Sequence, residues 1–168
     1  MKTKTKMSIL FIVQAGVIAA LYVVLTFLSH LANLDSGVIQ VRISEALCVL
    51  SVFTPAAIPG LTIGCFLSNL MNGCIWQDIL FGTLATFLGA LLGYLLRKIS
   101  IWLVPIPTVL ANALIVPFVL VYAYGVPDAW WFCFLTVGAG ELIAAYVLGM
   151  ILYFAARKPL SKVLTLRN

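Results

Sequence analysis

Long stretches without charge constrain this chain more than any other feature of its sequence. Residues 8–28 hold no charged side chain and reach the length of about 20 residues that a helix needs to cross the hydrocarbon layer. Hydrophobic residues make up 64% of the 168 residues and charged residues only 9%, which is more apolar surface than a soluble core of this length can hide. The sequence therefore predicts an all-α membrane protein that forms one transmembrane domain.

Polar clusters and prolines divide the chain into six predicted spans. Pro55, Pro59 and Gly60 break the long uncharged segment between Glu45 and Asp78, because proline and glycine interrupt helices. The predicted spans are residues 8–28, 39–53, 57–72, 79–96, 108–124 and 129–156.

The basic residues predict how these spans are oriented. With six spans and both termini in the cytoplasm, Arg42 is the one of the ten basic residues that falls outside, as the positive-inside rule requires. The basic residues expected inside are Lys2, Lys4, Lys6, Arg97, Lys98, Arg157, Lys158, Lys162 and Arg167. They lie at the ends of apolar runs and form no basic stripe interleaved with aromatic residues, so we expect no nucleic-acid partner.

Polar side chains in four of the spans are unusual for an apolar environment. They are Arg42 and Glu45 in the second span, Asn69 and Asn72 in the third, Asn112 in the fifth and Glu141 in the sixth. Such residues usually face the interior of a helix bundle or a water-filled cavity. We therefore expect them to line one pocket that opens outward. The polar residues 29–40 form a predicted loop that covers it.

Carboxylates and amides suit a planar, nitrogen-rich ligand, because a carboxylate accepts N–H donors and an amide both donates and accepts. Trp76 and Trp130 are candidate stacking partners for such a ligand.

Each candidate also has a structural interpretation. Arg42 and Glu45 are three residues apart and can pair with each other. Asparagines can join helices through hydrogen bonds, and tryptophans can anchor a helix at the membrane interface. Glu141 lacks a nearby cation in its span, and an unpaired buried carboxylate is costly. We therefore predict Glu141 as the main ligand contact.

Small residues follow one side of the first span. Ala15 and Ala19 are four apart, as are Gly16 and Ala20, a spacing that lets another helix approach closely. That helix can belong to the same bundle or to a partner, and the spacing alone favours the same bundle.

The cysteines and the single histidine offer little further chemistry. The four cysteines have no metal-ligand spacing, and His30 is the only histidine. We expect structural thiols and no metal or other cofactor, with a disulfide between Cys74 and Cys133 left open.

Four motifs resemble the QueT family of substrate-binding S components of energy-coupling factor (ECF) transporters. They are VRISEAL at residues 41–47, FTPAAIPG at 53–60, DILFGTLAT at 78–86 and VLANALI at 109–115. The resemblance implies a six-helix S component in the bacterial plasma membrane. This component would capture a queuosine precursor, a 7-deazaguanine base, and would work with a transmembrane coupling protein and two ABC ATPases.

The resemblance also assigns a role to the small residues. Ala15 and Ala19 match the AxxxA patch with which S components dock on the coupling protein, and Gly16 and Ala20 extend it. The sequence contains no GxxxxGK[ST] loop, so ATP hydrolysis is expected from the partner subunits.

Other classes of protein remain open at this stage. One alternative is an S component for another vitamin. A second is a self-sufficient secondary transporter in which Glu141 is a proton or cation site, although no internal repeat is visible. A membrane enzyme is disfavoured because the sequence has no GxSxG nucleophile motif and no set of metal-binding histidines.

Overall fold

The computed structural model describes the backbone of residues 2–34 and 39–164, and the side chains of residues 9–34 and 39–159. Within these ranges every regular element is a helix. In chain order the elements are α1 (Lys2–Leu31), η1 (Ile43–Val52), α2 (Ala57–Met71), α3 (Trp76–Leu96), η2 (Ile101–Leu103), α4 (Ile106–Phe118), η3 (Val119–Ala123), α5 (Trp130–Glu141), η4 (Leu142–Leu148) and α6 (Gly149–Leu164). Of the η elements, η1 and η2 are 3₁₀ helices, and η3 and η4 are π-helical.

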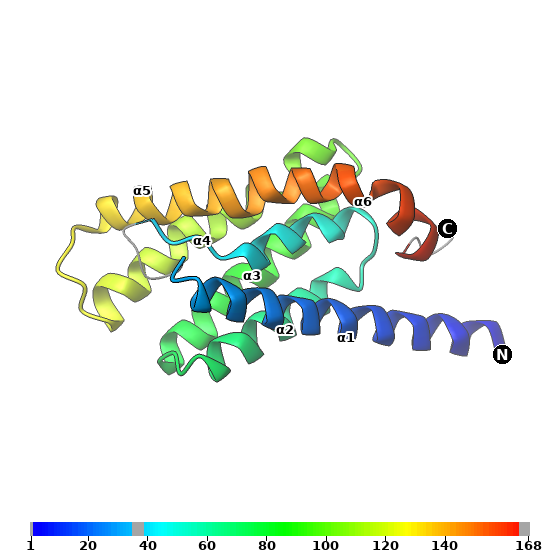
Figure 1. The fold of residues 1–168 in the computed structure, drawn as a ribbon, viewed down its shortest axis with the longest axis horizontal. Coiled ribbons are helices and arrows are strands. Elements are labelled where there is room, and N and C mark those ends of the chain that lie inside the picture. Colours follow the sequence, from blue (N-terminus) through cyan, green and yellow to red (C-terminus); the bar gives the residue numbers. More distant parts are fainter. Residues whose placement is uncertain (1, 35–38, 165–168) are drawn as a thin grey trace.

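Four helical segments are long and apolar enough to cross a membrane. They are Ile9–Leu31, Trp76–Leu96, Ile101–Ala123 and Trp130–Pro159, and η1 and α2 are shorter apolar helices. The start of α1 and the end of α6 lie at the same end of the bundle (Figure 1), as an even number of crossings requires. Six crossings and cytoplasmic termini stay predictions.

The second predicted span differs from its expected form. Only Ile43–Val52 is helical, and Arg42 before it is extended. The amide of Val41 instead donates to the carbonyl of Leu34, so this backbone pairs with the turn after α1. The predicted loop 29–40 is also shorter than expected, because α1 continues to Leu31. Its residues 35–38 lie outside the described residues.

The 3₁₀ form lets η1 run through the centre of the bundle in few residues. Ten residues extend over about 20 Å as a 3₁₀ helix, compared with about 15 Å as an α-helix. Eight consecutive residues, from Ser44 to Ser51, are buried. At the last residue of η1, the carbonyl of Val52 accepts a hydrogen bond from Arg97 Nη1 at 3.2 Å. The helix thus runs from Arg42, which precedes its first residue, to the contact with Arg97.

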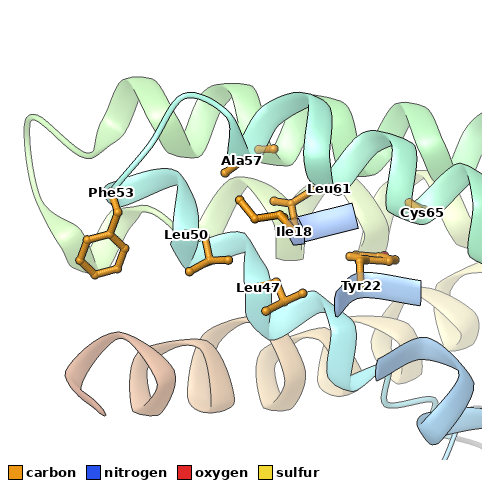
Figure 2. Packing of buried hydrophobic residues seen from close by; sticks show 9 residues of the cluster. Ile18, Tyr22, Leu47, Leu50, Phe53, Ala57, Leu61 and Cys65 are labelled. Carbon is orange, nitrogen blue, oxygen red and sulfur yellow. The ribbon is translucent and has the colours of Figure 1, made fainter. Parts of the chain in front are cut away.

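One face of η1 forms the hydrophobic core. Residues three apart eclipse in a 3₁₀ helix, so Leu47, Leu50 and Phe53 share one side. They pack with residues of α1 and α2, including Ile18 and Leu61 (Figure 2). Burial of this side leaves Glu45 and Cys48, which also are three apart, on another face.

The first two α-helices pack with their backbones close together. A Cβ atom added to Gly60 would lie 2.9 Å from the carbonyl oxygen of Ala15, and one added to Gly64 would lie 3.0 Å from that of Ala19. Ala15 and Ala19 are therefore buried under α2, whereas Gly16 and Ala20 are exposed. Because α2 covers Ala15 and Ala19, a partner could contact them only if α1 and α2 separated.

Candidate functional site

A small polar cavity lies where η1, α3, α4 and α5 meet. Four of the predicted site residues line it, namely Arg42, Glu45, Asn112 and Glu141. The other lining residues are Gln40, Cys65, Gly82, Thr86, Val116 and Val137. Its volume of about 30 Å³ is enough for about one water molecule. Pockets for small ligands usually hold roughly 300–1,000 Å³, so a ligand has to widen this cavity.

Two polar atoms in the wall of the cavity lack a partner. Glu141 and Asn112 are only 7% and 4% exposed. Among the described residues, neither Glu141 Oε2 nor Asn112 Nδ2 has a hydrogen-bond partner. An unsatisfied buried polar group costs about 1–3 kcal/mol. The two side chains lie near each other, and together they offer one acceptor and one donor to a ligand.

Glu141 occupies a special position in its helix. It is the last residue of α5 and is followed directly by the π-helical η4, and π-helical turns are frequent at functional sites. Two residues of η1 pack on this region: Cys48 Sγ lies 3.6 Å from the carbonyl of Ala145, and a Cβ on Gly149 would lie 3.3 Å from the carbonyl of Ala46. This packing brings Glu45 and Glu141 into the lining of one cavity.

Glu45 is held in place by the first helix. The hydroxyl of Tyr22, which is fully buried, donates to Glu45 Oε1. One turn further along α1, Thr26 Oγ1 donates to Ser44 Oγ at 2.8 Å, and Ser29 Oγ accepts from the amide of Ile43 at 2.9 Å. We call Tyr22, Thr26 and Ser29 the hydroxyl ladder. It fixes the start of η1, and the sequence analysis missed it although hydroxyl residues spaced by four and three in an apolar helix are a recognisable signal.

Arg42 does not pair directly with Glu45, contrary to one prediction from their spacing. Its Nη1 donates to Asn69 Oδ1 at 3.2 Å, while Glu45 accepts from Tyr22. Arg42 precedes η1 in extended conformation, so the geometry of residues three apart in a helix does not apply. Its charge is attracted first by Asp78 and less strongly by Glu45. Asn69 thus supports Arg42 and does not itself line the cavity.

Asp78 connects this site with the turn that follows η3. It lies in the first turn of α3, where the helix dipole stabilises a carboxylate, and its Oδ2 accepts from the Tyr124 hydroxyl at 3.1 Å. Burial and the nearby Asp78 carboxylate raise the pKa of Tyr124 to about 12. Burial, together with the same carboxylate, also raises the pKa of Cys74. Tyr124 therefore remains a hydrogen-bond donor at neutral pH.

Three predicted site residues lie away from the cavity. Asn72 caps the end of α2 and is half-buried, and Trp76 is 64% exposed. Trp130 packs between Phe118 and Phe134, with ring centroids 5.2 and 5.5 Å away. None of the three lines the cavity at Glu141, and their contact with a ligand stays a prediction.

Gln40 lines the cavity although the sequence analysis did not name it as a site residue. Its carbonyl lies directly against Gly140 on α5, where a Cβ atom would overlap it. This contact places Gln40 beside Glu141. No sequence pattern predicts this contact, because it joins the backbones of two segments that are far apart in the sequence.

Metal and disulfide chemistry find no support in the structure. All four cysteines, Cys74 and Cys133 included, are free thiols. Across residues 9–34 and 39–159, no group of three or more histidine, cysteine or acidic side chains is placed to hold a metal ion.

Comparison with known proteins gives two matches. The family model described as QueT transporter matches residues 12–158. The queuosine precursor transporter QueT of Lactococcus lactis subsp. cremoris (strain MG1363) is 40% identical over 85 residues, which cover 51% of this chain and 50% of that protein. The aligned part thus spans about half the length of that relative. No solved structure matches the chain significantly.

These matches confirm the resemblance drawn from the four motifs. Both names describe transporters and not enzymes, and the four long apolar helices belong to a multi-pass membrane protein. The matched range includes every residue that lines the cavity, and the chain belongs to the QueT transporter family.

Proposed function

We propose that this chain captures a queuosine precursor, a 7-deazaguanine base, in the cavity between Glu45 and Glu141. We further propose that it acts as the S component of an ECF importer, with a coupling protein and two ABC ATPases as partners. Its family and the name of its relative support the substrate class. The partner subunits rest on the resemblance alone.

The observation that carries the proposal is the unpartnered pair Asn112 Nδ2 and Glu141 Oε2. A deazaguanine presents a row of N–H donors next to a carbonyl acceptor. A carboxylate can accept from the N–H groups, and an amide can donate to the carbonyl. One edge of the base would thus satisfy both atoms, and hydrogen bonds to an ionised carboxylate are stronger than those between neutral groups.

The lining of the cavity also includes a basic and a second acidic side chain, Arg42 and Glu45. Glu45 is held by Tyr22 and Arg42 by Asn69, so both side chains are fixed before a ligand arrives. Because these side chains are already ordered, ligand binding loses less conformational entropy. The ligand then has to separate the walls, since the cavity of about 30 Å³ cannot hold a base.

The energy for release is expected from partner subunits. The sequence has no P-loop, and the exposed side of α1 with Gly16 and Ala20 is the surface that we assign to the coupling protein. In this account Ala15 and Ala19 hold α1 against α2 and do not themselves contact the partner.

A thermal-shift screen of the purified protein tests the substrate class. The panel contains deazaguanines, riboflavin, thiamine, biotin and folate. We expect stabilisation by deazaguanines alone, because a ligand that binds the folded state raises its unfolding temperature. A response confined to a vitamin that is not a purine analogue would contradict the substrate and leave the transporter class intact.

Reconstitution tests the mode of energy coupling. Proteoliposomes that hold this chain alone should accumulate no base, and those that also hold the coupling protein and ATPases should do so only with ATP. Accumulation by the chain alone would contradict the proposed S component and favour a secondary transporter.

A further inference from the structure

Basic side chains gather at the end of the bundle that lies away from the cavity. Arg97 directly follows α3, and Asp78 lies in the first turn of that helix, so the two are about 28 Å apart along the axis at 1.5 Å per residue. Glu141 and Arg157 belong to one helical segment, Trp130–Pro159, and are at most about 24 Å apart along it. Both separations approach the thickness of the hydrocarbon layer, about 30 Å. The basic end and the cavity therefore belong to opposite interfaces of the membrane.

The segments that carry these basic residues hold no acidic side chain. The five acidic residues of the chain are Asp35, Glu45, Asp78, Asp128 and Glu141, so residues 79–127 and 142–168 contain none. The helix α6 runs to the end of the bundle at which α1 begins (Figure 1), and the start of α1 is basic as well. A ligand with negative charge is therefore complementary to this end of the protein.

The contacts of Arg97 leave its charge uncompensated. Its guanidinium carbon lies 3.9 Å from the centroid of the Tyr94 ring, and its Nη1 donates to the carbonyl of Val52 at 3.2 Å. Both partners are uncharged. Its Nε is buried and has no hydrogen-bond partner in the part of the chain that the structure describes. Arg97 thus joins the end of α3 to the end of η1 and keeps its full positive charge.

A second guanidinium is held at the surface beside a tryptophan. The guanidinium carbon of Arg157 lies 5.4 Å from the centroid of the Phe154 ring, within the range of about 6 Å for a cation–π contact. The Trp102 ring packs on the same phenylalanine with centroids 5.8 Å apart and is 50% exposed. Lys98 is exposed in the turn between α3 and η2. We call Lys98, Trp102, Phe154 and Arg157 the Trp102 cluster.

Exposed apolar side chains occur on the same segments as the cluster. Leu95, Ile99 and Ile151 are 57%, 73% and 60% exposed, and in a membrane such side chains face acyl chains. Tryptophan is enriched at the boundary between acyl chains and headgroups, and basic pockets between transmembrane helices bind acidic headgroups. A soluble anion would match only the charges, whereas a phospholipid matches both the charges and the apolar surroundings.

We propose that the Trp102 cluster is a binding site for an anionic phospholipid, with Lys98 and Arg157 on the headgroup phosphate and Trp102 at the level of the glycerol. A zwitterionic lipid fits less well, because its headgroup adds a positive charge next to the phosphate. This site lies at the opposite end of the bundle from the proposed ligand cavity and goes beyond the proposed function.

Native mass spectrometry of the purified full chain tests the preference for an anionic headgroup. The protein is mixed in detergent with equal amounts of phosphatidylglycerol and phosphatidylcholine that have the same acyl chains, so that only the headgroups differ. We expect the complex with phosphatidylglycerol to be at least about fivefold more abundant, because each basic residue near an anionic headgroup contributes about that factor.

Charge variants locate the site. Arg157→Gln and Lys98→Gln should each lower the preference for phosphatidylglycerol about fivefold. Lys158→Gln is the matched control, because it removes the same charge from the adjacent position, whose side chain points about 100° away around the helix. It should lower the preference by less than twofold.

A pair of tryptophan variants tests the aromatic part. Trp102→Leu should lower the amount of bound phosphatidylglycerol. Trp131→Leu is the control, because Trp131 is also exposed, at 63%, but lies in the first turn of α5 at the other end of the bundle. It should leave the amount unchanged.

Four outcomes would overturn the site. They are equal amounts of the two lipid complexes, an effect of Lys158→Gln as large as that of Arg157→Gln, and equal effects of the two tryptophan variants. The fourth is calorimetric binding of inorganic phosphate without added phospholipid that Arg157→Gln abolishes, since it would show a simple anion site. None of these measurements uses the base or its transport, so the proposed function stands or falls separately.

Discussion

Replacing Tyr22 by phenylalanine removes one hydroxyl from the centre of the bundle. That hydroxyl donates to Glu45 Oε1, and Glu45 is only 3% exposed. The ring remains, so its contact with Gly64 on α2 is kept and no large cavity forms. The change therefore isolates a hydrogen bond to a buried carboxylate.

The expected loss follows from the nature of that bond. A hydrogen bond to a charged group contributes about 1.5–3 kcal/mol to stability. In a chain of this size 1 kcal/mol shifts the midpoint of thermal unfolding by about 2–4 °C. We expect Tyr22→Phe to lower the unfolding temperature by about 3–12 °C.

Thermal unfolding in detergent measures this shift, with Tyr122→Phe as control because Tyr122 is 76% exposed. The control should lie within about 1 °C of the parent protein, since exposed positions contribute little. An equal unfolding temperature for both variants would refute the hydroxyl ladder as a support of η1.

A double-mutant cycle tests the charge of the partner. In a Glu45→Gln background the Tyr22 hydroxyl still has an oxygen to donate to, but a bond between neutral groups contributes only about 0.5–1.5 kcal/mol. Tyr22→Phe should therefore cost less in that background than in the parent. Equal costs would contradict an ionised Glu45.

Three further predictions follow from close contacts and from one raised pKa. Gly89→Ala should lower stability by about 1–3 kcal/mol through overpacking, because its Cβ would lie 2.7 Å from Thr108 Cα. Gly16→Ala is the control, because a Cβ atom added there has no atom within 4 Å, and it should keep or raise stability. Thermal unfolding measures both variants, and equal shifts of their unfolding temperatures would refute the α3–α4 contact. Gly140→Ala should weaken binding of 7-deazaguanine, because the new Cβ displaces Gln40. Gly138→Ala has only an ordinary contact of 3.6 Å with Ala113 and should bind like the parent in calorimetry; equal affinities would contradict the role of Gln40. The pKa of Tyr124, raised to about 12, lies above the ordinary value of about 10, so its stabilising contribution is complete below pH 10 and is lost as the pH rises through about 12. The difference in ultraviolet absorbance between the parent and Tyr124→Phe should show this late ionisation, and a midpoint near 10 would contradict the contact with Asp78.

Hydropathy predicted the long helical segments because a helix that crosses a membrane needs a continuous run of apolar residues. Residues 8–28 correspond to a long apolar helix. The turn before α2 contains Pro55, whereas Pro59 lies in the first turn of α2 itself. The 3₁₀ form of η1 was not predictable in this way. It depends on how neighbouring helices enclose Ser44–Ser51, and no local propensity encodes that enclosure.

The polar residues of the cavity were predictable because a polar side chain is costly within an apolar run. Arg42, Glu45, Asn112 and Glu141 stand out for this reason, and they share one cavity. Trp76 does not line this cavity, and its exposed side chain also suits an anchor at the membrane interface.

The small residues of α1 show a related limit of sequence reasoning. The spacing of Ala15 and Ala19 shows that another helix can approach closely, but it does not identify that helix. In the structure the helix that packs against them is α2.

Calorimetric titration of 7-deazaguanine into the purified protein and its Glu141→Gln variant tests the central claim most directly. Asn112→Leu and Asn72→Leu complete the set, because they remove the same amide inside and outside the cavity. We predict that the parent and Asn72→Leu bind the base with equal affinity, and that Glu141→Gln and Asn112→Leu each bind it at least about tenfold more weakly. Binding by Glu141→Gln and Asn112→Leu as tight as that of the parent would contradict the assignment of this cavity as the ligand site.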